Sequence, residues 1–482
     1  MANVLDVLGS WSMHSGPLYR RLATAIQHAI ANGEIPPGTA LPAERHLAKS
    51  LALGRSTVVG AYDLLRADGL LESKQGSGTW VAGAARNVAH RNAPQGSLRG
   101  AALAAGDHIV DLATASLPAA PMVRDALEHL RGDLLDQLLN TSGYSALGLP
   151  ELRRAVAEVF TRDGLPTTPD QVLITTGDQQ ALSLVCGQFL ELGDTAVVED
   201  PTSPGILDLL HEAPVAVRSC ASISSAGAWP IVETIAKAKP SLVYLLPALG
   251  PEGRVASEVE LRSFVSGVRD FTGVIIEDTS TRQLIPGDRP PLLARLTSKL
   301  NVLTVGSMSK VFWGGLRIGW IRGEENAILR LSRAKARADL GTPVLSQLVA
   351  AWLLRRIDEV SQIRRGELAS RHELAIITVR ERLPDFEICE SAGGVTLWLS
   401  MPRGASRPFS EVARRHGVAI VPGSALSAGG ASDGFLRVAL GNDIAAFRDG
   451  VERLARAWVH YGRTPEGDEA LGPAAGEEPT LV

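Results

Sequence analysis

The stretch Val302-Leu303-Thr304-Val305-Gly306-Ser307-Met308-Ser309-Lys310 runs from a short apolar strand into a loop that carries two serines and a lysine, and Arg317 follows downstream. Open α/β sheets bind ligands at the carboxyl ends of their strands, so we expect this loop to lie at a ligand site. The lysine amine can form an imine with an aldehyde, and the guanidinium can bind a phosphate. The pattern therefore predicts a site for pyridoxal phosphate (PLP) at Ser307, Ser309, Lys310 and Arg317.

A second strand end supplies the acidic partner that PLP chemistry requires. The apolar run Val274-Ile275-Ile276-Glu277-Asp278 ends in two carboxylates. We assign Asp278 to the pyridinium nitrogen, because a carboxylate there keeps the ring protonated and electron-withdrawing. Further upstream, residues 172–176 read as a strand that turns sharply into a helix, whose first N–H groups can bind an anion. The candidate cofactor-binding residues of this turn are Gly177, Asp178 and Gln179.

The order of these motifs resembles that of fold-type I aminotransferases. The matching residues are Tyr144, the helix start Gly148 to Arg153, the turn Thr176 to Gln179, Glu199-Asp200-Pro201, Pro251 with Gly253, Asp278, Lys310, Arg317 and Arg437. The resemblance implies that Lys310 carries PLP as an imine, that Asp278 pairs with the pyridinium and that Arg317 binds the phosphate. It also implies that Tyr144 reaches the phosphate of the neighbouring subunit and that Arg437 binds a substrate α-carboxylate, a role suited to its two-pronged donor geometry.

Three positions depart from that family's pattern. Ser203 stands where relatives place an aromatic ring against the cofactor, Gly250 where they have an asparagine, and Ser280 where they have a tyrosine. Contacts of this kind contribute about 1 kcal/mol each. The sequence therefore predicts that PLP is held loosely and that catalysis is inefficient.

The first 83 residues carry an independent signal. Apolar periodicity and capping residues predict three helices, and alternating residues around a glycine-rich turn predict a hairpin. The predicted helices cover residues 18–32, 43–51 and 55–68, and the predicted strands cover residues 70–72 and 79–81. This set of elements is a winged helix-turn-helix.

The same segment resembles the GntR family of DNA-binding regulators. The matching motifs are Gly33 to Gly38, Leu41 to Ala48, Tyr62 to Leu71 and the turn Gln75 to Thr79. Residues 1–83 contain seven Lys and Arg against six Asp and Glu, so we expect affinity for DNA to depend on placement and dimerisation rather than on a strong basic field. The candidate DNA-binding residues are Arg45 at the supporting helix, Arg55, Ser56 and Thr57 at the start of the recognition helix, and Gly76 in the wing.

Composition agrees with a soluble protein of more than one domain. The chain has 482 residues, 45% of them hydrophobic, and a formal net charge of −4. Its three cysteines match no metal spacing, and it has neither a secretory leader nor an apolar run of about 18 residues, so we expect a cytoplasmic protein without a metal site or a membrane span. Composition further predicts a flexible linker over 84–107 and a disordered tail over 463–482.

Strand-like and helical stretches alternate between linker and tail, which predicts an α/β domain over 108–462 with a smaller α+β subdomain from about residue 344. The resemblance to aminotransferases implies that this domain has the fold of PLP-dependent transferases. A winged helix-turn-helix ahead of such a domain is the layout of MocR-type regulators, a GntR subfamily. The resemblance implies a homodimer, with domain swapping left open, that binds a double-stranded operator and senses an amine or amino acid through exchange at the imine. A working aminotransferase with an added DNA-binding module, and a regulator that has lost PLP, remain the alternatives.

Overall fold

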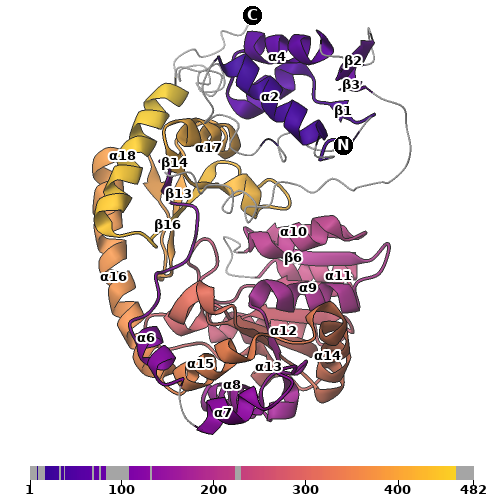
Figure 1. Ribbon diagram of the computed structural model, residues 1–482, viewed down its shortest axis with the longest axis vertical. Coiled ribbons are helices and arrows are strands. Elements are labelled where there is room, and N and C mark those ends of the chain that lie inside the picture. The colour runs from indigo at the N-terminus through magenta and orange to yellow at the C-terminus, as the bar shows by residue number, and fades with distance from the viewer. Residues whose placement is uncertain are drawn as a thin grey trace, which may run out of the picture.

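The computed structural model describes residues 8, 17–31, 34–36, 38–67, 70–74, 78–82, 108–130, 133–222 and 229–462. Three sequence predictions fall outside the described residues: the linker over 84–107, the tail over 463–482 and Gly76. Figure 1 shows the N-terminal domain at one end of the molecule and the lower part of the large α/β domain at the other.

The N-terminal domain is a winged helix-turn-helix, as predicted. Its described elements are α2 (Leu18–Ala31), β1 (Ala40–Leu41), α3 (Glu44–Leu51), α4 (Arg55–Ala67), β2 (Leu71–Lys74) and β3 (Gly78–Val81). The three strands form an antiparallel sheet in the order β1-β3-β2. Leu22 and Ile26 of α2 are fully buried against Leu47 of α3 and Val58 of α4. The helical spacing of these apolar residues is therefore what packs the helices together.

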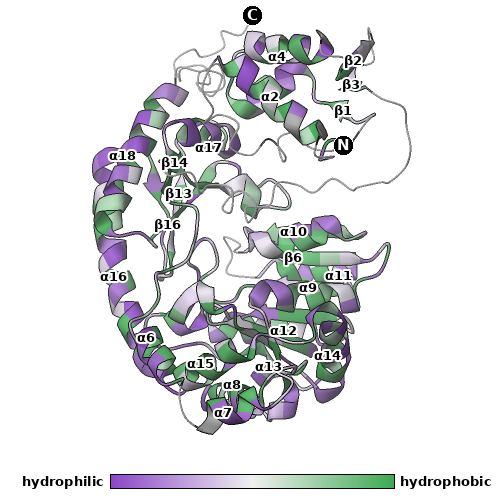
Figure 2. Ribbon diagram, viewed as in Figure 1, coloured by the Kyte–Doolittle hydropathy of each residue, from purple (hydrophilic) through white to green (hydrophobic). Residues whose placement is uncertain are grey.

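The large domain is built on a sheet of seven strands, in the order β5-β11-β10-β9-β8-β6-β7. The strand β11 runs antiparallel to both of its neighbours, and the other pairs are parallel. In sheet order the strands are β5 (Val172–Thr175), β11 (Gly319–Arg322), β10 (Asn301–Ser307), β9 (Val274–Asp278), β8 (Leu242–Leu245), β6 (Thr195–Asp200) and β7 (Ala216–Ala221). Figure 2 shows hydrophobic residues around β6, as expected for strands covered on both faces.

Helices cover both faces of this sheet. Alternate residues of β9 pack in different apolar clusters: Val274 and Ile276 lie with α9, α10 and α14, whereas Ile275 lies with α11, α12 and α13. The helices of the large domain are α6 (Met122–Glu128), α7 (Asp133–Leu139), α8 (Pro150–Arg162), α9 (Asp178–Phe189), α10 (Pro204–Glu212), α11 (Ile231–Ala238), α12 (Glu258–Gly267), α13 (Leu293–Leu296), α14 (Glu325–Asp339) and α15 (Val344–Leu354), with short turns η2 (Pro169–Gln171), η3 (Arg282–Leu284), η4 (Ser309–Trp313) and η5 (Gly314–Leu316).

The small subdomain has a four-stranded sheet in the order β12-β13-β16-β15, and the long helix α16 leads into it. Its elements are α16 (Ile357–Arg382), β12 (Glu387–Ile388), β13 (Thr396–Ser400), α17 (Ser406–Arg415), β14 (Val418–Ala419), β15 (Val421–Pro422), η6 (Gly423–Leu426), β16 (Phe435–Ala439) and α18 (Ile444–Tyr461). The strand β4 (Val110–Asp111) pairs with β14. The chain therefore enters the second domain through the small subdomain, which sequence patterns did not indicate.

Candidate functional site

A cavity of about 500 Å³ opens where the large and small parts of the second domain meet. Its wall includes the carboxyl ends of β9 and β10 and the amino end of α9, as ligand sites of open α/β sheets do. The predicted site residues that line it are Asp178, Gln179, Asp278, Ser309, Lys310, Arg317 and Arg437. The tertiary structure thus brings together residues spread over the chain from α9 to β16.

Lys310 lies one turn beyond β10, in the short π-helical turn η4. Its amine donates a hydrogen bond to the Ala115 carbonyl, and burial lowers the pKa of the ammonium. A lowered pKa increases the fraction of neutral amine, which is the nucleophilic form. The hydroxyls of Ser307 and Ser309 lie 2.6 Å apart. Ser309 lines the cavity, and its amide donates a 3.2 Å hydrogen bond to the hydroxyl of Ser307, which is not part of the lining.

The two adjacent carboxylates at the end of β9 point to opposite faces of the sheet. Asp278 lines the cavity, whereas Glu277 is buried on the other face, where it accepts a hydrogen bond from the Leu293 amide (2.8 Å). Burial raises the pKa of Glu277 to about 7. Of these two adjacent carboxylates, only that of Asp278 can therefore contact a ligand in the cavity.

Tyr244 is a site residue that the sequence analysis missed. Its hydroxyl donates a 2.6 Å hydrogen bond to Oδ2 of Asp278, and the Ser280 amide donates to Oδ1 at 2.9 Å. Burial raises the pKa of Asp278, and these two hydrogen bonds oppose that rise because they stabilise the ionised form. A tyrosine inside the apolar run 242–246 was the available signal in the sequence. Its partner, Asp278, could not be predicted because the two residues come together only through the pairing of β8 with β9.

The amino end of α9 and Arg317 form the cationic end of the cavity. Gly177 caps α9 with φ of 86°, and a Cβ at this position would lie 2.6 Å from Nη2 of Arg317. Glycine is therefore needed both for the backbone conformation and for the approach of the guanidinium. Arg317 itself has φ of 51°, in the left-handed region that a residue other than glycine seldom adopts. A helix amino end beside a guanidinium favours an anion, and the predicted binding of the PLP phosphate here stays a prediction.

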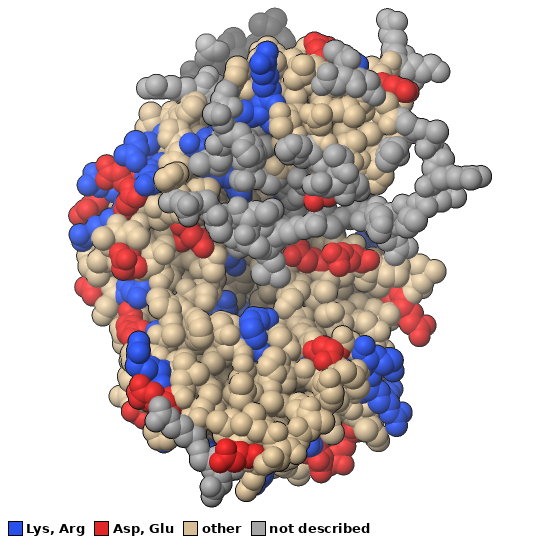
Figure 3. Space-filling view, in the orientation of Figure 1, with Lys and Arg blue, Asp and Glu red and all other residues tan. Residues whose placement is uncertain are grey.

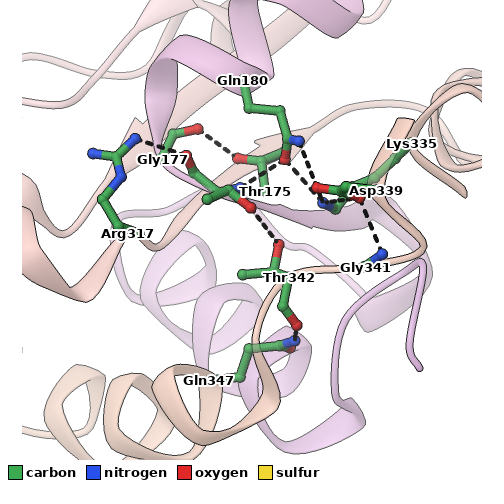
Figure 4. A network of polar contacts seen from close by, with 10 residues as sticks. Thr175, Gly177, Gln180, Arg317, Lys335, Asp339, Gly341, Thr342 and Gln347 are labelled. Atoms are coloured by element: carbon green, nitrogen blue, oxygen red, sulfur yellow. Dashed lines mark hydrogen bonds and ion pairs between the residues drawn. The ribbon is translucent and has the colours of Figure 1, made fainter. Parts of the chain in front are cut away.

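A polar network holds this turn in place (Figure 4). Nη2 of Arg317 donates to the Thr176 carbonyl at 2.9 Å, and the Thr176 amide donates to Oε1 of Gln180 at 2.8 Å. The buried Lys335 ammonium donates to the same Gln180 oxygen and pairs with Asp339 at 2.8 Å. Removing the partners of a buried ammonium is costly, so the network fixes the position of the turn.

Arg437 extends from β16 to the opposite side of the cavity. Its Nη2 donates to the Ala113 carbonyl at 2.7 Å, and its buried Nε has no partner among the described residues. Burial lowers the pKa of the guanidinium to about 10. A buried guanidinium with an unused donor matches a ligand carboxylate.

The remaining wall of the cavity is poor in side chains that could contact a ring. Ser203, Gly250 and Ser280 all line it, and no aromatic residue is among the described residues of the lining. These are the three positions at which the sequence departs from the aminotransferase pattern.

Tyr144 does not line the cavity of its own chain. It lies in the segment between α7 and α8, and 72% of its surface is exposed. The predicted role toward a neighbouring subunit remains a prediction, with an exposed side chain available for it.

Four of the candidate DNA-binding residues lie in α3 and α4, and the fifth, Gly76, is outside the described residues. Arg55 is the first residue of α4 and its side chain is 57% exposed, with Nη2 3.4 Å from Oε2 of Glu44. Arg45 and Ser56 are exposed and Thr57 is half-buried. On the face shown in Figure 3, Lys and Arg side chains are interspersed with Asp and Glu, so this face carries no field of one sign. The roles of these residues in DNA binding stay predictions.

In the part of the chain that the structure describes, no group of three or more His, Cys, Asp and Glu side chains is arranged to hold a metal ion. Across the same residues, none of the helices has the length and apolar character required to cross a membrane.

A family model described as aminotransferase class I and II matches residues 109–454. The chain belongs to this family. Members of this aminotransferase family normally depend on PLP, and the cavity has the corresponding lysine, aspartate and arginines in one place. A second model, described as bacterial regulatory proteins of the gntR family, matches residues 18–81. The chain therefore joins a GntR-type helix-turn-helix domain to an aminotransferase domain, which is the organisation of MocR-type regulators.

Some similar proteins share this two-domain organisation, and others match the aminotransferase domain alone. The chain is 29% identical to the uncharacterized HTH-type transcriptional regulator YisV of Bacillus subtilis, over 84% of this chain and 89% of that protein. It is also 29% identical to the probable rhizopine catabolism regulatory protein MocR of Rhizobium meliloti, over 63% and 65% of the two chains. The structure is similar to that of LysN, an alpha-aminoadipate aminotransferase of Thermus thermophilus solved with N-(5'-phosphopyridoxyl)-L-leucine, with a TM-score of 0.66 and 26% identity over 76% of this chain and 95% of LysN.

Proposed function

We propose that the protein is a transcription regulator in which the aminotransferase domain binds PLP and responds to an amine or amino acid. The observation that carries the proposal is the cavity in which Lys310, Asp278, Arg317 and Arg437 converge, below a helix-turn-helix domain in the same chain. When bound, PLP supplies an aldehyde that condenses with primary amines and a ring that withdraws electrons.

The described residues fit this cofactor. The desolvated Lys310 amine would take the aldehyde carbon, and Asp278 would accept a hydrogen bond from the pyridinium. The phosphate would bind at the amino end of α9 beside Arg317, whose guanidinium can lie this close to the helix because Gly177 has no side chain. The unpartnered Nε of Arg437 would then be available to a ligand carboxylate.

The wall at Ser203, Gly250 and Ser280 supports sensing rather than efficient turnover. A ring without a stacking partner is less firmly oriented, and proton transfer depends strongly on orientation. Exchange of the Lys310 amine for a ligand amine forms one carbon–nitrogen bond, breaks another and moves protons between the two amines. Unlike transamination, it does not require the removal of a proton from a carbon atom of the ligand. The alternative of a working aminotransferase rests on the presence of the lysine, the aspartate and both arginines, and therefore requires a direct test.

The cofactor half of the proposal is tested on the purified full chain with added PLP. Formation of a visible yellow band is expected, and borohydride reduction followed by peptide mapping should leave the pyridoxyl group on Lys310. Lys310→Ala should lose both signals. A label on another lysine, or no label with PLP in excess, would contradict the proposal.

The sensor half is tested with a panel of amines and amino acids and a keto acid acceptor. We expect a spectral change and an altered affinity for a selected operator, without sustained turnover. Turnover at about 1–1000 per second with no change in DNA affinity would establish the working aminotransferase instead.

We further propose that a homodimer binds double-stranded operator DNA in the cytoplasm through α4, because the N-terminal domain carries nearly balanced charge and one copy would bind weakly. Arg55→Ala should cost about 1–3 kcal/mol if the arginine contacts a base. An unchanged affinity and footprint would exclude Arg55 from the interface.

A further inference from the structure

Among the described residues, α3 of the N-terminal domain contacts α17 of the aminotransferase domain. Nη1 of Arg415, the last residue of α17, donates to the Leu51 carbonyl at 3.0 Å, and Nη2 donates to the Ala52 carbonyl at 3.1 Å. These carbonyls end α3, where backbone acceptors lack helical partners and the helix dipole is negative. Ala52 is also buried in the apolar core of the small subdomain, beside Phe409 of α17. The contact thus combines a charged cap with apolar packing.

The helix that Arg415 caps is the one that supports the recognition helix. Leu47 and Leu51 of α3 share a buried core with Val58 and Ala61 of α4. The Tyr62 hydroxyl of α4 also donates to the Pro42 carbonyl ahead of α3, at 2.9 Å. Because α3 and α4 are packed as one unit, a displacement of α3 displaces the residues predicted to bind DNA.

At its other end, α17 is bound to a loop that also contacts the edge of the cavity. Ser406, the first residue of α17, is fully buried and bonds Asp433 through its amide (2.7 Å) and its hydroxyl (3.2 Å). In the same loop, Ser427 and Ser432 donate to the carboxylate of Asp200 at 2.7 and 3.2 Å. Asp200 ends β6, and the chain continues directly to Ser203 in the cavity wall.

We infer that α17 is the surface through which the aminotransferase domain holds the DNA-binding domain, and that ligand binding in the cavity reorients α3 through Asp200, the loop 427–433 and Arg415. The inference rests on the proposed binding of PLP. Its physical basis is a series of buried and part-buried hydrogen bonds that joins Asp200 to the loop 427–433, this loop to α17, and α17 to α3, so that a shift at one end moves the other.

The test uses hydrogen–deuterium exchange of the full chain with and without PLP, which requires neither the operator nor the effector. The reporters are the amides of Ala52 and Leu53, which bond the Lys49 and Ala48 carbonyls at 3.2 and 3.0 Å. PLP should change their exchange in the wild type. In Arg415→Ala, exchange at α3 should be about tenfold faster, as expected when a charge-assisted hydrogen bond is lost, and should no longer respond to PLP.

Arg414→Ala is the matched control, because it removes the same charge from the adjacent position of α17. It should keep both the slow exchange and the response to PLP. Asp200→Asn is a second test variant, which leaves the contact between Arg415 and α3 intact. It should reduce the change in exchange that PLP causes but should not alter the exchange rate of α3 without PLP, so the inference remains testable if Arg415→Ala unfolds.

Failure of the coupling between the cavity and α3 can be distinguished from failure of PLP binding. If PLP binds but the exchange of α3 does not change, or if Arg415→Ala responds like the wild type, the inference is wrong while PLP binding stands. If the visible band never forms, the proposed function fails first and the inference falls with it.

Discussion

Two groups of residues in the cavity lining differ in what they offer a ligand. The charged group has ionic and covalent chemistry: Lys310, Asp278, Arg317 and the amino end of α9. The neutral group is Ser203, Gly250 and Ser280, which offer little surface to a ring. Charged contacts determine whether a ligand binds and at which position, whereas packing against its ring determines the orientation of the ring. A site that keeps the first and lacks the second is suited to binding and exchanging an amine more than to fast turnover.

The largest effect is expected from Arg317 in the charged group. Arg317→Ala should weaken PLP binding about 10- to 100-fold, the range for losing a hydrogen bond to a charged group. Equilibrium titration followed by the visible band measures this. Arg333→Ala removes an exposed arginine of α14 and should leave the affinity unchanged. Equal affinities for Arg317→Ala and the wild type would place the phosphate elsewhere.

A smaller effect is expected from Tyr244, which acts through Asp278. Tyr244→Phe removes the hydrogen bond that stabilises the ionised carboxylate, so it should raise the pKa of Asp278 and weaken PLP binding about tenfold. Asp278 must be ionised to pair with the pyridinium. The loss of affinity on acidification should therefore begin at a higher pH in the variant than in the wild type.

Titrations across a pH series measure this shift, and Tyr62→Phe is the control because it removes a buried tyrosine hydroxyl far from the cavity. A uniform loss of affinity at every pH would mean that Tyr244 only shapes the core.

The smallest effect on PLP affinity is expected at Ser203, one of the neutral lining residues. Ser203→Tyr should tighten PLP binding by about 0.5–1.5 kcal/mol if it restores a stacked ring, whereas Ser203→Ala should change it little because alanine adds no ring. Dissociation constants from the same titration decide the matter. Weaker binding in Ser203→Tyr would show that the space beside Ser203 is not where the ring lies.

Sequence patterns predicted most of the parallel sheet but missed two of its strands. The strand β7 lies at the sheet edge and reads Ala-Val-Arg-Ser-Cys-Ala, without an apolar run, and β11 is four residues long with a glycine and an arginine. Their strand conformation depends on neighbours: β11 inserts antiparallel between β5 and β10. Local residue preferences carry no information about such pairing.

The sequence by itself determined the two-domain organisation, the strand ends that carry Asp278 and Lys310, and the helix start at Gly177, because each depends on residues close together in the chain. Only the tertiary structure decided that Asp278 faces the cavity and Glu277 the opposite side, that Tyr244 donates to Asp278, and that Arg415 caps α3. These contacts join residues far apart in sequence, and strand register and helix packing, which arise only when the whole chain folds, bring their atoms within hydrogen-bonding distance.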